Sequence, residues 1–442
     1  MIVYLESLGC SRNQVDSEIM LGKLASAGHG ISRDPAEAEA IIVNTCGFIS
    51  AASDEAVEVL LDMARFKQTG SCRRLIAAGC LAQRYKDDPD LVASLPEVDA
   101  FLGTAACEQI VEAVENGEPQ ALTLFPEPGS RGFQNLEDRR ELISENYAYI
   151  KVSEGCNRVC TYCIIPALRG RQRSRPVTDL CTEAVMLADQ GVKEIILTAE
   201  NTTDWGQDLD QAPGFETVLK GLGQALAGRD TWIRFLYTHP ATLNRNMVQT
   251  VQNHANICSY YDVPIQHAAS SVLKRMGRPY TREDLVSLFK MIREADPGAS
   301  LRTTVIVGFP GETQEEFNSL LAFIEQVRFD HLGVFVYSDS EDLSSHHLKD
   351  HVDPDTAELR QDTIMAAQAR ISESLNQRHL GRVYPVLVEE SPEAGVYIGR
   401  TPFQAPEVDG MTFIYADSLD MGRVVQVRIT DAHEYDIAGE TV

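Results

Sequence analysis

The sequence contains no run of about eighteen consecutive apolar residues, the length that a helix needs to cross a bilayer. Its opening residues, Met1–Glu6, lack the basic region that begins a signal peptide. Ten cysteines in 442 residues are too few for a disulfide framework, and they favour a reducing compartment with thiols kept for metal or redox chemistry. We therefore expect no membrane association and a cytoplasmic location.

Positive charge is also scarce, because 39 Lys and Arg face 65 Asp and Glu and leave a formal net charge of −26. Such a surface repels polyphosphate backbones, which need a basic footprint, so a direct nucleic-acid substrate is disfavoured. A small molecule or a basic protein fits better, although acidity can serve only to keep a protein soluble. The length suggests roughly three domains, and the 44% apolar content is typical of a globular protein.

Three cysteines occur within eight residues, Cys156, Cys160 and Cys163, with the spacing Cys-x3-Cys-x2-Cys. Thiolates select iron–sulfur clusters, zinc or copper(I), and three are one short of the set that closes a structural zinc site or an ordinary [4Fe–4S] cluster. A cluster held by three cysteines keeps one iron open to a small molecule. Unligated thiols, and zinc with a remote fourth ligand, are the two alternatives.

The first segment, residues 1–140, is expected to be an α/β domain with a parallel sheet. Strand-like runs at 2–8, 40–45 and 74–79 alternate with helical patterns, which predicts right-handed crossovers. Each run is followed by a cysteine, and the carboxyl ends of parallel strands share one edge, so we expect a second three-thiolate site there. Its members are Cys10, Cys46 and Cys80. The cysteines without such placement are interpreted as structural: Cys72, Cys107, Cys181 and Cys258.

The middle segment, residues 141–377, alternates strands and helices for longer. Six units predict a curved parallel sheet or partial (β/α)6 barrel, smaller than the closed eight-unit form. The strand-like runs are 148–153, 193–198, 232–237, 258–263, 301–307 and 332–337. The cysteine triad follows the first of them, on the carboxyl face where barrels keep their active sites. Residues 115–146 read as a connector before this domain, because they are rich in Pro, Gly and charge.

Polar residues and a glycine follow the other strand-like runs. Each has a plain reading as a turn or a helix start. As a set they are expected to form the rim of the site: Glu200, Asn201, Thr202, Thr238, His239, Gln266, His267, Gly308 and Glu312.

The last segment, residues 378–442, follows a long predicted helix at 355–380. Short alternating runs predict a small β-barrel; they are 384–389, 396–400, 412–416 and 423–429. Small barrels often bind oligonucleotides, but five Arg, no Lys and eleven Asp and Glu give this segment a formal charge of −6. That sign is wrong for RNA phosphates. A basic protein partner fits better, and a packing role is the alternative.

The triad and the residues that follow it, Ile164-Ile165-Pro166, Arg169-Gly170 and Arg173–Pro176, resemble the radical S-adenosylmethionine methylthiotransferases. The resemblance covers nearly the whole chain. It implies an N-terminal three-cysteine domain, a radical barrel and a C-terminal TRAM barrel, with two [4Fe–4S] clusters and S-adenosylmethionine as cofactors. It also implies that Cys156, Cys160 and Cys163 are catalytic and hold the cluster that cleaves S-adenosylmethionine. The auxiliary cluster would be held by Cys10, Cys46 and Cys80.

Within this family, the members that modify ribosomal protein uS12 are most similar, through the stretches 9–18, 201–206 and 261–268. The sequence departs from their pattern at Asn201, where Asp is common, and at 337–343, which lacks a Gly-Thr pair. The resemblance implies addition of a methylthio group to the β-carbon of an aspartate, with an electron donor such as flavodoxin or ferredoxin. A tRNA adenosine is the alternative substrate. Cofactor contacts are expected at Tyr162, Glu200, Gln266 and Gly308.

Overall fold

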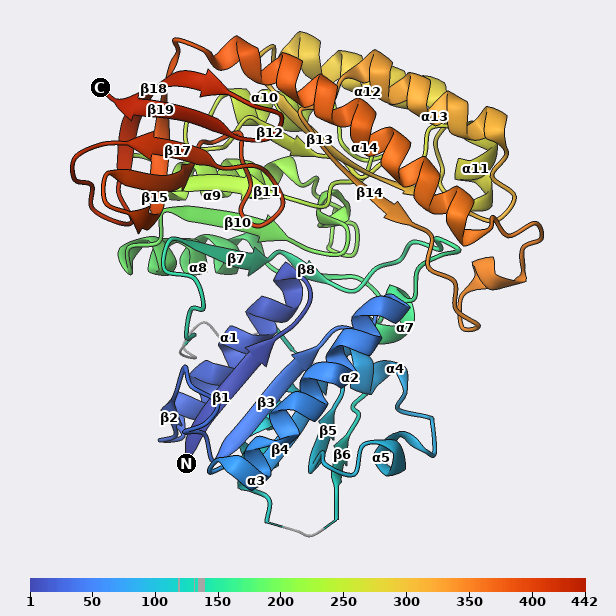
Figure 1. Cartoon of the computed structure of the whole chain (residues 1–442), viewed down its shortest axis with the longest axis vertical. Coiled ribbons are helices and arrows are strands. Elements are labelled where there is room, and N and C mark those ends of the chain that lie inside the picture. The colour runs from blue at the N-terminus through green and yellow to red at the C-terminus, as the bar shows by residue number, and fades with distance from the viewer. Residues whose placement is uncertain (118–119, 131, 134–139) are drawn as a thin grey trace.

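The computed structural model describes residues 1–117, 120–130, 132–133 and 140–442. Figure 1 shows an N-terminal α/β part (blue), a central barrel (green to orange) and a small C-terminal barrel (red) packed on the flank of the central one. The N-terminal part lies beneath the central barrel (Figure 1). Among the described helices, none is long and apolar enough to cross a membrane.

The N-terminal part is built on a six-stranded parallel sheet with the order β2-β1-β3-β4-β5-β6. Its strands are β1 (Ile2–Ser7), β2 (Gly30–Ile31), β3 (Ala40–Thr45), β4 (Arg74–Gly79), β5 (Ala100–Leu102) and β6 (Leu122–Leu124). Its helices are α1 (Ser11–Ser26), α2 (Ser50–Ala64), α3 (Phe66–Thr69), α4 (Cys80–Arg84), α5 (Leu91–Ser94) and α6 (Ile110–Glu115), with a 3-10 turn at Cys107–Gln109.

The central strands β3 and β4 are buried at each of their six positions. Parallel strands covered on both faces have this continuous apolar character, and separate apolar cores fill the two faces of the sheet. The three predicted strands are confirmed. The interpretation of residues 115–146 as a plain connector is wrong at β6, which adds an edge strand beside β5. Strand β6 is short and none of its three residues is fully buried, so no continuous apolar run marks it in the sequence.

The central barrel consists of two three-stranded parallel sheets, β11-β10-β7 and β12-β13-β14. An isolated parallel bridge between Ile233 and Ile257 joins them, which confirms the predicted six-unit partial barrel. The strands are β7 (Tyr147–Lys151), β10 (Glu194–Thr198), β11 (Trp232–Phe235), β12 (Tyr260–Asp262), β13 (Ser300–Val307) and β14 (His331–Val336). The helices are α8 (Val177–Asp189), α9 (Glu216–Ala225), α10 (Arg245–Gln252), α11 (Ser270–Arg275), α12 (Arg282–Ala295), α13 (Gln314–Val327) and α14 (Pro354–Asn376).

Between β7 and α8 the chain forms a loop closed by a short antiparallel ribbon. Strand β8 (Ser153–Glu154) pairs with β9 (Arg173–Ser174), and helix α7 (Ile165–Arg169) lies inside the loop. The predicted strand at 148–153 is therefore split into β7 and β8. This ribbon fixes both ends of the segment that contains the cysteine triad.

The C-terminal barrel is closed, with the strand order β15-β16-β17-β19-β18. Its strands are β15 (Val383–Glu393), β16 (Val396–Arg400), β17 (Thr412–Tyr415), β18 (Val424–Ala432) and β19 (Ile437–Thr441). The sequence predicted four of these five strands. The long helix predicted to reach residue 380 ends as α14 at Asn376 and continues as a 3-10 turn, Gln377–His379.

Candidate active site

The three N-terminal cysteines meet at one edge of the sheet. Cys10 follows β1, Cys46 follows β3 and Cys80 begins α4 directly after β4, and these three strands are neighbours. Gly9 has a φ of +97°, and a Cβ on it would lie 2.9 Å from the Cβ of Cys46. Only glycine therefore lets the first cysteine loop approach the second so closely.

Asn13 ties these loops together from the first turn of α1. Its Nδ2 donates hydrogen bonds to the carbonyl oxygens of Leu8, at 3.1 Å, and Thr45, at 2.9 Å. Its Oδ1 accepts one from a guanidinium nitrogen of Arg169 at 2.6 Å, and the Cys80 thiol lies 3.9 Å away. One buried amide thus links all three cysteine-bearing loops.

The three thiols differ in acidity. Burial raises the pKa of Cys80 to about 12 and also raises the pKa of Cys46. Burial alone would raise the pKa of Cys10, but the guanidinium groups of Arg12 and Arg169 outweigh it and lower that pKa. Cys10 is therefore more acidic than an ordinary cysteine, whereas Cys46 and Cys80 are less acidic.

The second triad lies in the loop between β8 and β9. The backbone N–H of Cys156 donates to Gly170 at 3.1 Å, and that of Cys163 donates to Cys160 at 3.2 Å. The backbone N–H of Arg158 points at the sulfur of Cys156, at 3.4 Å. Burial raises the pKa of Cys156 and raises that of Cys163 to about 12.

The segment after α11 supports this loop from outside. Thr161 donates its backbone N–H to Met276 at 3.2 Å and its hydroxyl to Arg275 at 2.9 Å. Gly277 has a φ of +73°, and a Cβ there would lie 2.8 Å from the carbonyl oxygen of Val159. The cysteine loop is thus held by direct backbone contact with another part of the barrel.

Each cysteine set offers three soft sulfur donors to a metal group. Among the described residues, no group of three or more His, Cys, Asp or Glu is placed to hold one metal ion. A zinc site gathers its four ligands around one atom, whereas the thiolates of a [4Fe–4S] cluster bind different irons and stand further apart. Soft thiolates without oxygen ligands also suit iron–sulfur chemistry.

Buried polar atoms without a hydrogen-bond partner collect at the carboxyl ends of the barrel strands. In the described part of the chain they belong to these residues of the predicted rim: Glu200, Asn201, His239, His267 and Glu312. Those of Glu200, His267 and Glu312 also lie at ion-pair distance from a charged neighbour. Such atoms cost free energy unless a ligand or water satisfies them. Burial, with a contribution from the cations Arg278 and Arg158, lowers the pKa of His239 to about 2, so its imidazole is neutral. The buried amide of Asn201 and the neutral imidazole of His239 are therefore available to a polar cofactor at the barrel mouth.

Other rim residues already have protein partners. Thr202 donates its hydroxyl to Leu236, and Thr238 donates its hydroxyl to Asp262. Both therefore join neighbouring strand ends to one another.

The four residues predicted to contact the cofactor have different surroundings. The ring of Tyr162 packs in an apolar cluster beside Phe309, with ring centroids 6.4 Å apart, and Arg278 lies 5.7 Å from its centre. Gln266 and Gly308 have positive φ values of 67° and 75°. Their cofactor contacts stay predictions.

Glu200 is the most distinctive of the four. Its side chain is 3% exposed, and it lies 3.6 Å from Arg12 and 3.8 Å from Arg169. Burial, and the negative charge of Glu154, raise its pKa. This carboxylate stands where the N-terminal part meets the barrel, and its cofactor contact also stays a prediction.

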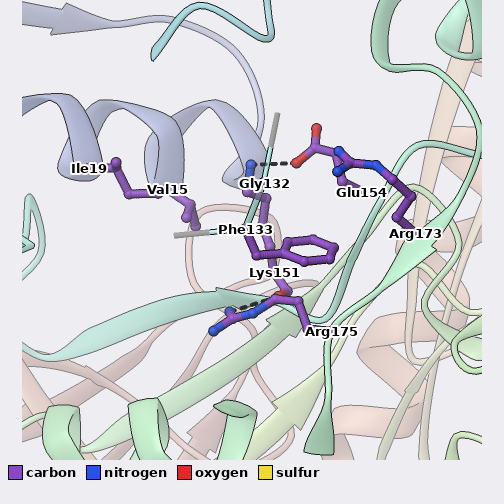
Figure 2. Close-up of a pocket in the computed structure, with 8 residues that line it drawn as sticks. All are labelled: Val15, Ile19, Gly132, Phe133, Lys151, Glu154, Arg173 and Arg175. Atoms are coloured by element: carbon purple, nitrogen blue, oxygen red, sulfur yellow. Dashed lines mark hydrogen bonds and ion pairs between the residues drawn. The ribbon is translucent and has the colours of Figure 1, made fainter. Parts of the chain in front are cut away.

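A charge network joins the two parts and was not foreseen from the sequence. Arg169 pairs with Asp16 at 3.0 Å and with Glu154 at 2.6 Å, and Lys151 pairs with the same two carboxylates at 2.8 and 2.6 Å. Figure 2 shows Lys151 and Glu154 in contact beside a cavity of about 20 Å³, large enough for one water molecule. Phe133 covers Arg173 there (Figure 2). The only sequence signal was the motif Arg169-Gly170 after the triad.

Three known protein families match successive parts of the chain. Residues 2–103 match the uncharacterized protein family UPF0004, residues 150–324 match the radical SAM superfamily, and residues 380–442 match the TRAM domain.

Full-length relatives carry one shared name. A protein of Desulfosudis oleivorans, named ribosomal protein uS12 methylthiotransferase RimO, is 49% identical over 442 residues and 100% of both chains. Proteins of the same name from Clostridioides difficile and Geobacter sulfurreducens are 42% and 41% identical, over 100% of this chain and 98% of theirs.

Solved structures share the fold. The radical S-adenosylmethionine methyltransferase TsrM from Kitasatospora setae aligns with a TM-score of 0.57 at 13% identity, over 84% of this chain and 89% of its own. The cobalamin-dependent S-adenosylmethionine radical enzyme OxsB aligns with a TM-score of 0.52 at 13% identity, over 84% of this chain and 56% of its own.

Proposed function

The chain belongs to the RimO family of ribosomal protein uS12 methylthiotransferases, and from that premise we propose which of its residues carry out the reaction. One observation supports the proposal above others: Arg169, from the loop that carries the barrel triad, lies 3.8 Å from the sulfur of Cys80 in the N-terminal set and 3.8 Å from Glu200 at the barrel rim. In this assignment the chain adds a methylthio group to the β-carbon of an aspartate in uS12. The domain boundaries 1–140, 141–377 and 378–442 belong to the same proposal.

The chain uses iron–sulfur and S-adenosylmethionine chemistry, and we assign a [4Fe–4S] cluster to each cysteine set. When bound, these groups supply the one-electron chemistry that removes hydrogen from an unactivated carbon, which no side chain can do by proton transfer. Cys156, Cys160 and Cys163 hold the cluster that binds S-adenosylmethionine, and Cys10, Cys46 and Cys80 hold the auxiliary one. The buried rim atoms at Glu200, Asn201 and His239 are available to orient the cofactor.

We place substrate entry where the two parts of the molecule meet, because Arg169 of the triad loop contacts Cys80 of the N-terminal set there. The acidic charge of the chain, −26 overall, favours a basic protein such as a ribosomal protein over RNA. We place the reaction in the cytoplasm, where ribosomal proteins are found, and assign the electron supply to a small carrier such as flavodoxin or ferredoxin.

Anaerobic reconstitution with iron and sulfide tests the two-cluster assignment. Two clusters bind about eight irons per chain, and one binds about four. Replacement of Cys10, Cys46 and Cys80 together by alanine should halve the iron bound and preserve cleavage of S-adenosylmethionine. A wild-type chain saturated at about four irons would sink the assignment of a second cluster.

Mass spectrometry of both candidate substrates tests the target. The reconstituted enzyme is incubated with uS12 and, separately, with unmodified tRNA, under a chemical reductant. We expect a methylthio adduct on an aspartate of uS12 and none on tRNA. Methylthioadenosine in the tRNA, together with unmodified uS12, would show that the chain is a tRNA adenosine methylthiotransferase instead.

A further inference from the structure

Arg169 connects the two cysteine sets physically. It ends helix α7, six residues after Cys163, so it belongs to the same loop as the barrel triad. Its guanidinium nevertheless reaches the other set, where one nitrogen lies 3.8 Å from the sulfur of Cys80 and 2.6 Å from Oδ1 of Asn13. The side chain is 2% exposed. A residue of the barrel therefore completes the surroundings of a thiol in the N-terminal part.

The position of this guanidinium is fixed by carboxylates on several sides. Asp16 and Glu154 accept from Arg169 at 3.0 and 2.6 Å, and Glu200 lies 3.8 Å away. Lys151 donates hydrogen bonds to both Asp16 and Glu154, and these bonds fix the two carboxylates that accept from Arg169. The planar fork of arginine suits several simultaneous acceptors, and a lysine ammonium cannot reproduce that geometry.

A buried positive charge beside a thiolate has a defined electrostatic effect. In a poorly solvated interior the attraction is much stronger than in water, and it favours the more negatively charged state of its neighbour. Hydrogen bonds to cysteine sulfurs and local charge are also what set the potentials of iron–sulfur clusters.

We propose that Arg169 is a positioning residue of the auxiliary cluster: it donates an N–H···S hydrogen bond to Cys80 and raises the reduction potential of that cluster. The inference rests on the proposed function, since it requires a cluster on Cys10, Cys46 and Cys80. It adds a dependence between the two sites, because the auxiliary cluster acquires its full potential only when the barrel loop is docked against it.

The test uses the full chain with Cys156, Cys160 and Cys163 replaced by alanine, so that only the auxiliary site can hold iron. After anaerobic reconstitution, the reduction potential is measured by optical and EPR-monitored redox titration. We expect Arg169→Gln to shift the potential to a more negative value, because it removes the charge. Arg169→Lys should have a potential between those of the wild type and Arg169→Gln, because lysine keeps the positive charge but lacks the planar guanidinium.

Arg140→Gln is the matched control. Arg140 is also a buried arginine between the two parts, 6% exposed, and it pairs with Glu18 and Glu183 at 2.6 and 2.7 Å. Within the described residues its guanidinium bonds Glu18, Glu183 and the carbonyl oxygen of Tyr149 and no cysteine, so its loss should leave the potential unchanged. An equal shift in Arg140→Gln would overturn the inference by showing that the interface as a whole is responsible. An unchanged potential in Arg169→Gln would overturn it directly.

A second measurement covers the case in which Arg169→Gln fails to retain its cluster. The triad-free protein is labelled with ¹⁵N-guanidino arginine, and pulsed EPR on the reduced cluster records ¹⁵N coupling. We expect a coupling that weakens in Arg169→Lys, with Arg12 beside Cys10 as the remaining source. A spectrum without any coupling, or one unchanged by that substitution, contradicts the inference. If no cluster forms in the parent protein that lacks the barrel triad, the assignment of a second cluster is wrong. That result is distinct from one that rejects only the role of Arg169.

Discussion

The thiols of each cysteine set face different local conditions. Guanidinium groups prevail over burial at Cys10, whereas burial prevails at Cys80 and Cys163, where it raises the pKa to about 12. Metal ligation requires the thiolate, so the buried thiols release protons on binding iron. In the proposed assignment each set thus contains a thiol, Cys80 or Cys163, that stays protonated and less prone to oxidation until iron binds.

Replacement of Cys160 by alanine should remove the barrel cluster. We expect the iron content to fall by about four per chain and the cleavage of S-adenosylmethionine to disappear, because two thiolates cannot hold the cluster. Iron analysis and quantification of 5′-deoxyadenosine check both results. Cys181→Ala is the control, since Cys181 lies half-buried on α8, away from both sets, and should retain both properties. Cleavage that persists in Cys160→Ala would refute the role of this residue.

At the scale of elements, the barrel triad depends on a contact made by backbone rather than by side chains. Gly277 approaches the carbonyl oxygen of Val159 so closely that no other residue fits without displacing the cysteine loop. Thr161 reinforces the contact through Met276 and Arg275. The segment after α11 thus acts as a support on which the triad is shaped.

Gly277→Ala should therefore impair the barrel cluster selectively. Its Cβ would meet Val159 at 2.8 Å, and its φ of +73° is strained for a residue with a side chain. Gly381→Ala is the matched control, because Gly381 has a φ of +74° but nothing within 4 Å of an added Cβ. Both variants place alanine at a positive φ, which costs about 1–2 kcal/mol. Only Gly277→Ala also brings its Cβ into steric conflict with the carbonyl oxygen of Val159. Iron content that falls equally in both would contradict the contact argument.

The strands predicted from the sequence were those with continuous apolar runs, which indicate burial. Ala40–Thr45 and Arg74–Gly79 are continuous buried runs, and the structure confirms both strands. Strands β5, β6 and β19 were missed, because their few residues become strands only through pairing with a neighbour. The convergence of Cys10, Cys46 and Cys80 could be predicted, because each follows a strand of a parallel sheet and the carboxyl ends of such strands share one edge. The partners of Arg169 could not be predicted, because the sequence around this residue does not indicate which domain its side chain contacts.

At the scale of the whole molecule, a buried ionic group attaches the C-terminal barrel. Arg400 of β16 bonds Glu194 of β10 at 2.6 Å, and Arg234 of β11 bonds the other oxygen of Glu194. Arg400 also bonds Glu389 at 2.7 and 2.8 Å. Glu194 and Arg234 have fully buried side chains. The small barrel is therefore attached through an ionic group whose centre, Glu194 and Arg234, is fully buried.

Arg400→Leu should destabilise the protein by about 3–5 kcal/mol, because it leaves the buried Glu194 with one cation in place of two. Urea unfolding followed by tryptophan fluorescence measures the change. Arg428→Leu on β18 is the control, since Arg428 is exposed and should change stability by less than about 0.5 kcal/mol. Equal losses in the two variants would show that Arg400 does not act through its buried partners.

The same group predicts a pH dependence. Burial alone would raise the pKa of Glu194, but Arg234 and Arg400 outweigh it and lower that pKa below the ordinary 4.5. Its stabilisation is thus complete above pH 4.5 and is lost as the pH falls through the lowered pKa. Glu194→Gln should be less stable than the wild type at pH 7, and the difference should narrow below pH 4.5. A difference in unfolding free energy that is constant with pH would contradict this.

The position of Arg169 has a consequence for how the protein is made. The ribosome releases Cys10, Cys46 and Cys80 first, and Arg169 follows Cys80 by 89 residues. At a synthesis rate of about 5–20 residues per second, that separation lasts roughly 5–20 seconds. During this interval the N-terminal sheet can fold, but its thiols lack the guanidinium that later covers Cys80. Maturation of the auxiliary site is therefore ordered in time: its three thiols are translated first, and its final electrostatic environment arrives with the barrel.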